Sequence, residues 1–571
     1  MSGPRSISEL DLSPLPGKKY WSCEREWREE IIYFLLVDRF HDDLPREPAD
    51  TEERAAGGGT PDQLRRFCGG KLKGITEHLD YIADLGCTAV WLSPILENEG
   101  APDPDCGSYH GYATRNYLNV DPRFGTKADL VELVDKAHSL GVRVFLDVVA
   151  NHTGDVFSYK DGEVCWYRDD NGQYELGDWR HPDYPVPTEL RKPECYHRRG
   201  QIRPWAWDNI PETQWGDFVT LKGLNKDDTP EGLAVLEALI ASYRYWIREA
   251  DIDGFRMDAV KHMGEMPVAR FCQAVREYAY RLGKREFFLF GELVAGDDAI
   301  HRYAGPNTPA NRGDKTIYYG LSSVLDFPLY WTLPGVIKGF TPPSSLMQRY
   351  DALKDQALSR GELGRYLVTF IDNHDQIGQS YKMRFAARTC DEQVIAGVGY
   401  LICALGTPCI YYGTEQGLSG EGSGDEYIRE AMFDPQNPTR NFLNKQCRIY
   451  QEIAKITHVN HTQNALRFGR MYFREISGDG VDFGPPLGHP CTLAFSRILA
   501  NVEVLVAYNT STTDARSDGV IVDGALHRAG DRLSYLYGGE GEVEVRAHPD
   551  PNNHSLFVEL PLAPMQFVIL R

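Results

Sequence analysis

The sequence lacks any long apolar segment. No run approaches the ~18 consecutive apolar residues of a membrane-spanning helix. Residues 1–20, which include Pro4, Pro14 and Pro16, also contain no apolar core of the kind found in signal peptides. We therefore expect a cytoplasmic protein that does not bind membranes.

Positive charge is in deficit as well. The chain has 61 lysine and arginine residues against 82 aspartate and glutamate residues, which gives a net charge of −21 at pH 7. A surface of this sign repels polyphosphates and acidic membranes, so nucleic acid is excluded as a partner and a neutral substrate is favoured. The charge does not identify that substrate, and the sequence leaves the oligomeric state open.

No pair among the 12 cysteines has the Cys-x-x-Cys spacing. Without a secretion signal, this scattered pattern favours free thiols over a disulfide framework. Long low-complexity tracts are also absent, and a content of 42% hydrophobic and 25% charged residues is ordinary for a globular protein. At 571 residues the chain exceeds one ordinary core, so we expect one large domain with attachments.

Short apolar runs alternate with amphipathic helical patterns through most of the chain. Continuous apolar runs of this length are typical of strands buried on both faces, as in parallel sheets. Eight of them with interposed helices predict an α/β protein built on a (β/α)8 TIM barrel. The expected strands are Ile31–Val37, Thr88–Leu92, Val142–Val149, the run that starts at Gly254, Phe287–Gly291, Ser323–Phe327, Leu367–Ile371 and Pro408–Tyr412.

Two regions depart from this alternation. Between 151 and 222 the chain is rich in Trp, Asp and Pro and has no clear helix, which predicts a subdomain inserted after the third strand. From about 456 onward helical patterns vanish, and short strand patterns predict an antiparallel β-domain. The expected division is an N-terminal extension at 1–26, the barrel at 27–150 and 223–455, the inserted subdomain at 151–222, and the C-terminal β-domain at 456–571.

Polar residues follow several predicted strands, at the ends where a barrel of this kind gathers its active site. Arg256 and Asp258 lie two residues apart after Gly254, so in a strand both side chains project from one face. The arginine would then hold the carboxylate ionised and oriented, as a nucleophilic aspartate requires. An Arg–Asp pair that only ties a strand to its helix is the alternative.

Further acids and histidines favour the catalytic interpretation. Glu292 follows the apolar run Phe287–Gly291, where loss of water should raise its pKa and favour a general acid. A single acid at a strand end is often a cap or a structural ion pair, whereas acids and histidines after several separate strands indicate catalysis. The other predicted strand ends carry Asp147 with Asn151 and His152, and His374 with Asp375.

Seven segments carry a resemblance to a known family. They are Thr88–Pro94, Tyr109–Tyr112, Asp147–His152, Gly254–His262, Gly291–Leu293, Phe370–Asp375 and Gly406–Glu415. In this order, over roughly residues 31–450, they resemble the α-amylase superfamily of retaining glycoside hydrolases. The inserted subdomain and the terminal β-domain also resemble the plan of that family.

The resemblance implies three catalytic carboxyls. Asp258 would be the nucleophile that forms a β-glycosyl ester, and Glu292 would act first as the acid and then as the base. Asp375 would hold the 2- and 3-hydroxyls of the sugar and stabilise the transition state. A retaining mechanism of this kind uses two carboxyls ~5–5.5 Å apart, one ionised and one protonated.

The same resemblance implies seven substrate-binding residues: His110, Tyr112, His152, Arg256, Lys261, His262 and His374. The arginine would keep the nucleophile ionised, and the histidines at 110, 152 and 374 would hydrogen-bond the sugar at the cleavage site. The tyrosine would stack on that sugar, while the adjacent lysine and histidine would line the leaving-group side.

Two positions bear on specificity and metal binding. Relatives with alanine after the nucleophile, as at Ala259, mostly cleave α-1,4 links. Calcium-binding relatives usually have aspartate where Gly223 stands. Asn151 and the carbonyl of His262 remain as ligands, but Ca²⁺ needs ~6–8 oxygens. We therefore expect no required cofactor and no metal-binding residues, with Ca²⁺ at this site as the alternative.

The main functional hypothesis is hydrolysis of α-1,4-glucosidic links in maltooligosaccharides or related α-glucans. The alternative is an α-glucosyl transferase or isomerase that uses the same ester on maltose, trehalose or sucrose. A non-catalytic family member is a third hypothesis, which the presence of all three acids opposes. Trp205, Trp207 and Trp215 are expected to close one end of the cleft and favour short soluble substrates, unless they only fill the core of the subdomain.

Overall fold

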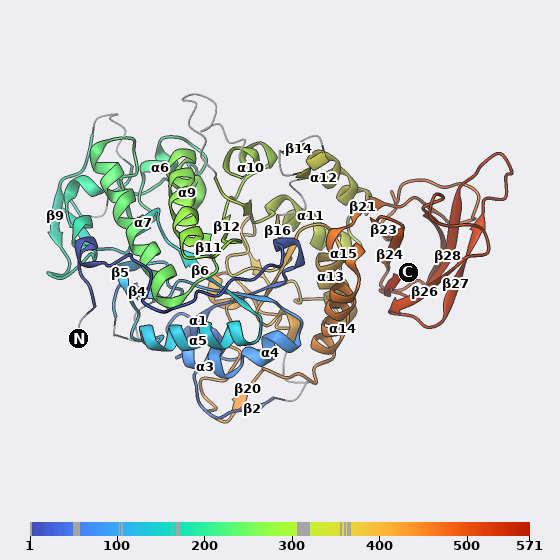
Figure 1. Ribbon diagram of the computed structural model, residues 1–571, viewed down its shortest axis with the longest axis horizontal. Helices are drawn as coiled ribbons and strands as arrows, with labels where there is room; N and C mark the ends of the chain where they lie inside the picture. The colour runs from blue at the N-terminus through green and yellow to red at the C-terminus, as the bar shows by residue number, and fades with distance from the viewer. Residues whose placement is uncertain are drawn as a thin grey trace.

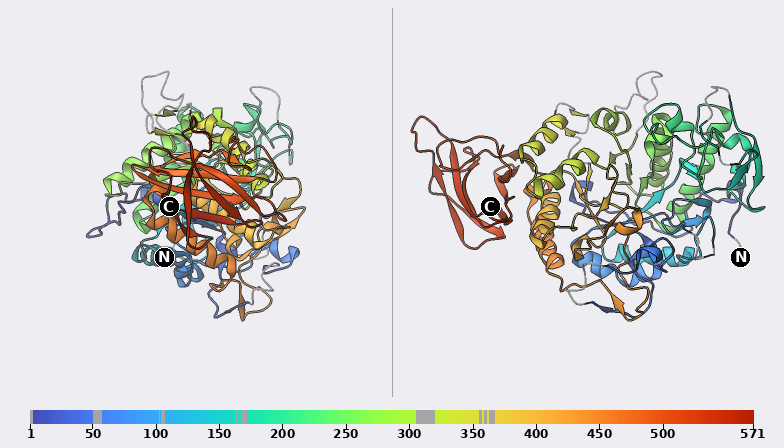
Figure 2. Two further views of the ribbon diagram at one scale, coloured as in Figure 1. Left: turned by 90° about the vertical axis from the view of Figure 1, so that its right-hand side faces the viewer. Right: turned by 180° about the vertical axis from the view of Figure 1, so that it is seen from behind.

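Three parts lie in a row along the long axis of the molecule (Figure 1): the inserted subdomain, a barrel and a terminal β-domain. Figure 2 shows the same order from behind. The computed structural model describes residues 3–49, 57–101, 103, 107–162, 164–166, 172–304, 320–354, 357–358, 361–362 and 367–571.

Eight parallel strands form the barrel. Hydrogen-bonded neighbours follow one another as β13, β12, β11, β6, β3, β1, β18 and β16, and a parallel bridge between Leu325 and Val368 joins the two ends of this series. The strands are β1 (Ile32–Leu35), β3 (Ala89–Leu92), β6 (Arg143–Val148), β11 (Gly254–Met257), β12 (Phe288–Gly291), β13 (Ser323–Val324), β16 (Val368–Thr369) and β18 (Thr407–Tyr411). The predicted (β/α)8 fold is confirmed.

Burial on both faces explains the apolar composition of these strands. Every residue of β1, β3, β11 and β12 is buried, as expected for parallel strands that helices cover. Long helices around the sheet include α5 (Lys127–Ser139), α7 (Pro230–Ala250), α9 (Glu265–Arg281) and α13 (Asp391–Cys403). Thr126 and Asp129 start α5 with a capping box, in which each side chain accepts a hydrogen bond from the other residue's backbone N–H.

The inserted subdomain leaves the barrel after β6 and returns to it before α7. Its two ends pair antiparallel as β7 (His152–Thr153) and β10 (Lys222–Gly223). Between them lie the hairpin of β8 (Phe157–Tyr159) and β9 (Leu176–Trp179) and the short helix α6 (Glu212–Trp215). The Phe157 ring packs edge-on against Tyr159, Trp179 and Tyr196 at centroid distances of 5.0–5.7 Å, which gives the subdomain its own aromatic core.

The C-terminal domain is a nine-stranded antiparallel sheet that starts with β21 (Arg470–Phe473). The boundary expected at 456 falls inside a helix, α14 (Arg448–Thr462), which α15 (Asn464–Phe468) follows. Isoleucines at helical spacing are buried along α14, and Asn460 donates to the Ile402 carbonyl of α13 at 2.8 Å, so this helix belongs to the barrel. The other strands are β22 (Ile476–Ser477), β23 (Thr492–Leu499), β24 (Val502–Asn509), β25 (Arg516–Val522), β26 (Arg532–Tyr537), β27 (Glu542–Ala547), β28 (Leu556–Leu562) and β29 (Phe567–Leu570).

The N-terminal residues form a packed extension. The Tyr278 hydroxyl donates to the Leu12 carbonyl at 2.8 Å, and the Trp21 N–H donates to Asp251 Oδ2 at 2.9 Å. The cysteines within the described residues are free thiols, and Cys106 lies outside those residues. No helix in the described part of the chain has the length and apolar character needed to span a bilayer.

Candidate active site

A cavity of about 640 Å³ lies at the carboxyl ends of the barrel strands. It brings together the three predicted acids, Asp258, Glu292 and Asp375. Four predicted substrate-binding residues also line it: Tyr112, His152, Lys261 and His262. The cavity is also lined by residues that were not predicted from the sequence: Phe218, Leu221, Val294, Ile377, Gly378, Lys382 and Asp425.

The remaining predicted residues, His110, Arg256 and His374, lie behind this lining. Arg256 is completely buried and contacts three carboxyl groups. Its Nη1 lies 2.8 Å from Asp147 Oδ1 and 2.9 Å from Asp258 Oδ1, and its Nη2 lies 2.9 Å from Glu292 Oε2. Arg256 and Asp147 are also register partners in the parallel strands β11 and β6, so their side chains share one face of the sheet.

One guanidinium cannot neutralise three buried carboxylates. The three acids therefore do not all ionise together at neutral pH. Burial raises the pKa of Glu292 to about 8; Arg256 opposes the rise and Asp258 adds to it. Burial raises the pKa of Asp258 to about 6, against the attraction of Arg256. Burial also raises the pKa of Asp147 to about 6, with Arg256 opposing. At neutral pH this cluster therefore holds Glu292 protonated and Asp258 ionised.

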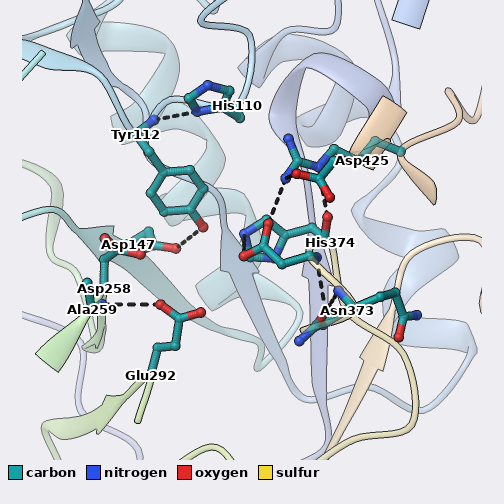
Figure 3. Close-up of polar contacts among 12 residues, drawn as sticks. His110, Tyr112, Asp147, Asp258, Ala259, Glu292, Asn373, His374 and Asp425 are labelled. Carbon is teal, nitrogen blue, oxygen red and sulfur yellow. Dashed lines mark hydrogen bonds and ion pairs between the residues drawn. The ribbon is translucent and has the colours of Figure 1, made fainter. Parts of the chain in front are cut away.

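The backbone of β11 is unusual at both of its ends. At Gly254 a Cβ atom would lie 2.4 Å from the Phe288 carbonyl oxygen, so only glycine lets the two strands approach this closely. Directly after Asp258, Ala259 has φ +48°, in the left-handed region that few non-glycine residues adopt. This turn directs the Ala259 N–H to Glu292 Oε2 at 3.2 Å (Figure 3), so the residue after one acid binds the other.

Asp375 has a separate cation, Arg429, which the sequence analysis missed. Arg429 Nη2 donates to Asp375 Oδ1 at 2.6 Å, and its Nε donates to the His374 carbonyl at 2.8 Å. Burial would raise the pKa of Asp375, but His374 and Arg429 outweigh it and bring the pKa to about 2. Asp375 is therefore ionised at all pH values near neutral. Arg429 lies in an irregular segment outside every strand pattern, so no local signal marks it.

A hairpin that the sequence did not predict carries the segment Tyr109–Tyr112. Its strands are β4 (Leu96–Asn98) and β5 (Thr114–Val120). The Tyr112 hydroxyl donates to Asp147 Oδ2 at 2.9 Å, and the Tyr112 carbonyl lies 3.1 Å from His152 Nε2 (Figure 3 shows the first contact). The tyrosine thus joins the hairpin to both β6 and the inserted subdomain.

The three histidines predicted to bind sugar are uncharged at neutral pH. Burial lowers the pKa of His110 and of His374 to about 3, and that of His152 to about 4. A neutral imidazole has one donor and one acceptor, which suits hydroxyl groups. The His110 and His374 rings lie nearly parallel to the Tyr112 ring, at centroid distances of 5.7 and 5.4 Å.

Another part of the cavity lining is aromatic and comes partly from the inserted subdomain. The Phe218 ring packs edge-on against His262 at 4.4 Å, and Trp207 does so at 5.7 Å. His262 Nδ1 lies 2.8 Å from the Thr213 carbonyl oxygen, and Lys261 Nζ donates to Asp208 Oδ1 at 2.7 Å. These contacts attach the subdomain to the turn after β11.

Of the three tryptophans expected to close the cleft, Trp207 lines the cavity. The expectation is wrong for the other two. Trp205 is 72% exposed and packs near Arg203, and Trp215 stacks on His197 and donates to Asp227 Oδ1 at 3.1 Å. The sequence could not separate them, because spacing alone does not fix which aromatic side chain faces the barrel.

Comparison with known proteins agrees with this geometry. Residues 34–448 match the family described as alpha amylase, catalytic domain. The alpha-amylase of Streptomyces lividans is 29% identical over 95% of this chain, which spans only 62% of that protein's length. The cyclomaltodextrin glucanotransferase of Klebsiella oxytoca is 26% identical over 80% of this chain and 70% of its own length. The crystal structure of an Anoxybacillus alpha-amylase is 25% identical, with a TM-score of 0.69 over 96% of this chain and 99% of that one. The chain therefore belongs to the α-amylase catalytic-domain family.

Proposed function

We propose that the protein cleaves α-1,4-glucosidic links of maltooligosaccharides or related α-glucans by double displacement with retention. One observation carries the proposal. A single buried arginine contacts both Asp258 and Glu292, and their surroundings separate the pKa values to about 6 and about 8. Two neighbouring acids in different protonation states are what a retaining glycosidase needs.

In the first step, Glu292 gives its proton to the glycosidic oxygen as the bond from that oxygen to the sugar C1 breaks. Asp258 Oδ1 is held by Arg256, which leaves Oδ2 to bond C1 and form the glycosyl ester. Glu292 is then an anion, and Arg256 Nη2 at 2.9 Å stabilises it. In the second step Glu292 removes a proton from water, whose oxygen bonds C1 and releases Asp258. Two inversions give net retention.

Asp375 and the neutral histidines are proposed to bind the sugar at the cleavage site. A carboxylate that stays ionised can accept hydrogen bonds from two sugar hydroxyls and stabilise the positive charge that develops at C1. Arg429 donates to the Oδ1 atom of Asp375 and keeps this carboxylate ionised. We assign Tyr112 to stacking on the same sugar, and Lys261 and His262 to the leaving-group side.

Glycosyl transfer to an acceptor sugar is the second candidate function. The similarity to a cyclomaltodextrin glucanotransferase supports it, and so do Trp207 and Phe218, which offer apolar surface to an acceptor. Product analysis with maltose, maltotetraose and sucrose separates the two functions. Hydrolysis yields only shorter saccharides, whereas transfer also yields longer ones or isomers.

Proton NMR of the first product tests the common mechanism. With maltotetraose as substrate, the new reducing end should appear as the α-anomer before mutarotation mixes the anomers. Early accumulation of the β-anomer would exclude Asp258 as a nucleophile and would require a single displacement.

A further inference from the structure

The inserted subdomain joins the barrel at a junction where the chain leaves β6 and later returns. The Leu224 N–H donates to the Asn151 carbonyl at 3.0 Å, and Gly223 pairs with His152 across β10 and β7. His152 lines the active-site cavity, so the geometry of this junction reaches the proposed sugar-binding site directly.

A buried lysine lies at the centre of the junction. Lys226 is only 5% exposed, and its ammonium donates to the Leu224 carbonyl at 2.6 Å and to the Asn151 carbonyl at 3.0 Å. The two carbonyls belong to the two chain segments that meet here. One cation therefore holds the outgoing and the returning strand together.

A structural Ca²⁺ does not fit the same place. Asn151 Oδ1 is buried and has no hydrogen-bond partner in the protein, so one oxygen is available. At Gly223, where a carboxylate would be needed, a Cβ atom would lie 3.0 Å from the Gly216 carbonyl oxygen. The nearby Asp217 already accepts hydrogen bonds from the Gly223 N–H at 2.8 Å and from the Tyr159 hydroxyl at 2.6 Å.

Charge argues against the metal as well. An ammonium that already contacts the Asn151 carbonyl would repel a divalent ion bound to the side chain of the same residue. Within the described residues, no group of three or more His, Cys, Asp or Glu side chains is arranged to hold a metal ion. The two oxygens named from the sequence, those of the Asn151 side chain and the His262 carbonyl, are too few for Ca²⁺, which takes ~6–8.

We propose that the Lys226 ammonium is the built-in structural cation of this junction and that, through Asn151, it positions His152 for sugar binding. The protein is then independent of calcium. Burial lowers the pKa of Lys226 to about 7, and the adjacent Asp227 raises it. The two carbonyl acceptors also favour the ammonium form, so experiments at pH 6 examine the charged state.

Thermal unfolding of the full-length protein provides the first test, and it does not depend on the proposed reaction. At pH 6 the Tm of the wild-type protein should be the same with EDTA and with added CaCl₂, because a bound metal would stabilise the fold by mass action. A Tm that falls in EDTA and recovers with Ca²⁺ would overturn the proposal. This measurement uses only the wild-type protein, so its outcome does not depend on whether a variant folds.

Variants test the lysine itself. Lys226→Met keeps the side-chain length without the charge and should lower the Tm by at least about 3 °C, because two charge-assisted hydrogen bonds are lost. Lys226→Arg should restore part of the Tm. Lys226→Met with an unchanged Tm would overturn the structural role.

The positioning role needs a separate readout and rests on the proposed function. Lys222→Met is the matched control, because Lys222 is also buried in β10 but contacts Asp155 at 3.2 Å rather than the junction carbonyls. Measured well below either Tm, Lys226→Met should raise KM for maltotetraose at least about fivefold, and Lys222→Met should change it less than twofold. Equal changes in KM for the two variants would refute the positioning role of Lys226. The structural role, which the Tm measurements test, would not be affected.

Discussion

The Arg256 cluster predicts the pH dependence of activity. Glu292 must be protonated to give a proton, and Asp258 must be ionised to attack C1. As pH rises through the pKa of Glu292, about 8, the acid is lost; as pH falls through the pKa of Asp258, about 6, the nucleophile is lost. The kcat/KM for maltotetraose should therefore be bell-shaped with its maximum near pH 7, and should fall about tenfold per pH unit beyond each limb.

The size of the effect follows from the burial of Glu292. A pKa of about 8 instead of 4.5 means that the folded site favours the protonated acid by about 5 kcal/mol. The folded protein then binds a proton that the unfolded chain releases between these pH values, so stability falls as pH rises through that window. The Glu292→Gln variant has no carboxyl to ionise at this position, so this fall in stability with rising pH should disappear. Its Tm should exceed that of the wild-type protein at pH 9 and match it at pH 4.

A substrate whose leaving group needs no proton isolates the role of Glu292. With α-maltosyl fluoride, Glu292→Gln should release one equivalent of fluoride in a burst and then stall, because no base activates water. On maltotetraose the same variant should lose at least ~10³-fold in kcat. The reasoning fails if wild-type kcat/KM stays level through pH 9, or if Glu292→Gln still cleaves maltotetraose at pH 7 with wild-type kcat.

Four further outcomes follow from the site. Asp258→Asn and Asp375→Asn should each lower kcat by at least ~10³-fold with an unchanged circular dichroism spectrum; activity above about a tenth of wild type would remove the assigned role. Arg429→Met should raise the pKa of Asp375, because burial then acts without the guanidinium; carboxyl NMR titration should show the rise, and an unchanged pKa contradicts this. Trp207→Ala should raise KM for maltotetraose about tenfold through lost stacking, while the matched Trp205→Ala, whose ring is 72% exposed, should change it less than twofold. If Trp207 limits chain length, viscosity of amylose solutions should fall no faster than reducing ends appear, and a rapid early viscosity loss would show internal cleavage.

The sequence predicted the parts of the structure that depend on burial and on strand direction. Strands buried on both faces are largely apolar, and parallel strands bring their carboxyl ends to one edge, so Asp258 and Glu292 could be grouped without coordinates. Asp147 could be noted near the end of its strand, but its pairing with Arg256 depends on the register of β6 against β11, which the sequence does not specify.

Other features depend on contacts between distant segments. Arg429 meets Asp375 only because an irregular loop folds over the end of β16, and no periodicity marks such a loop. The hairpin of β4 and β5 was missed because it lies within a loop of mixed composition. Helix α14 extends past 456 because its buried isoleucines pack on the barrel, whereas the prediction relied on the strands that follow.

The bridge between Leu325 and Val368 has a consequence for the motions of the molecule. The neighbouring strands β1 and β3 share four register pairs, but β13 and β16 are two residues long, and among the described residues one bridge and the Asp326 N–H to Val368 carbonyl bond (2.9 Å) join them. The seam with the fewest hydrogen bonds opens at the lowest free energy. Amide hydrogen exchange should therefore be fastest in β16 and slowest in β3. Because β16 leads into Asp375, local opening at this seam would displace the carboxylate proposed to bind the sugar. The nucleophile and the acid would keep their positions, since they follow β11 and β12.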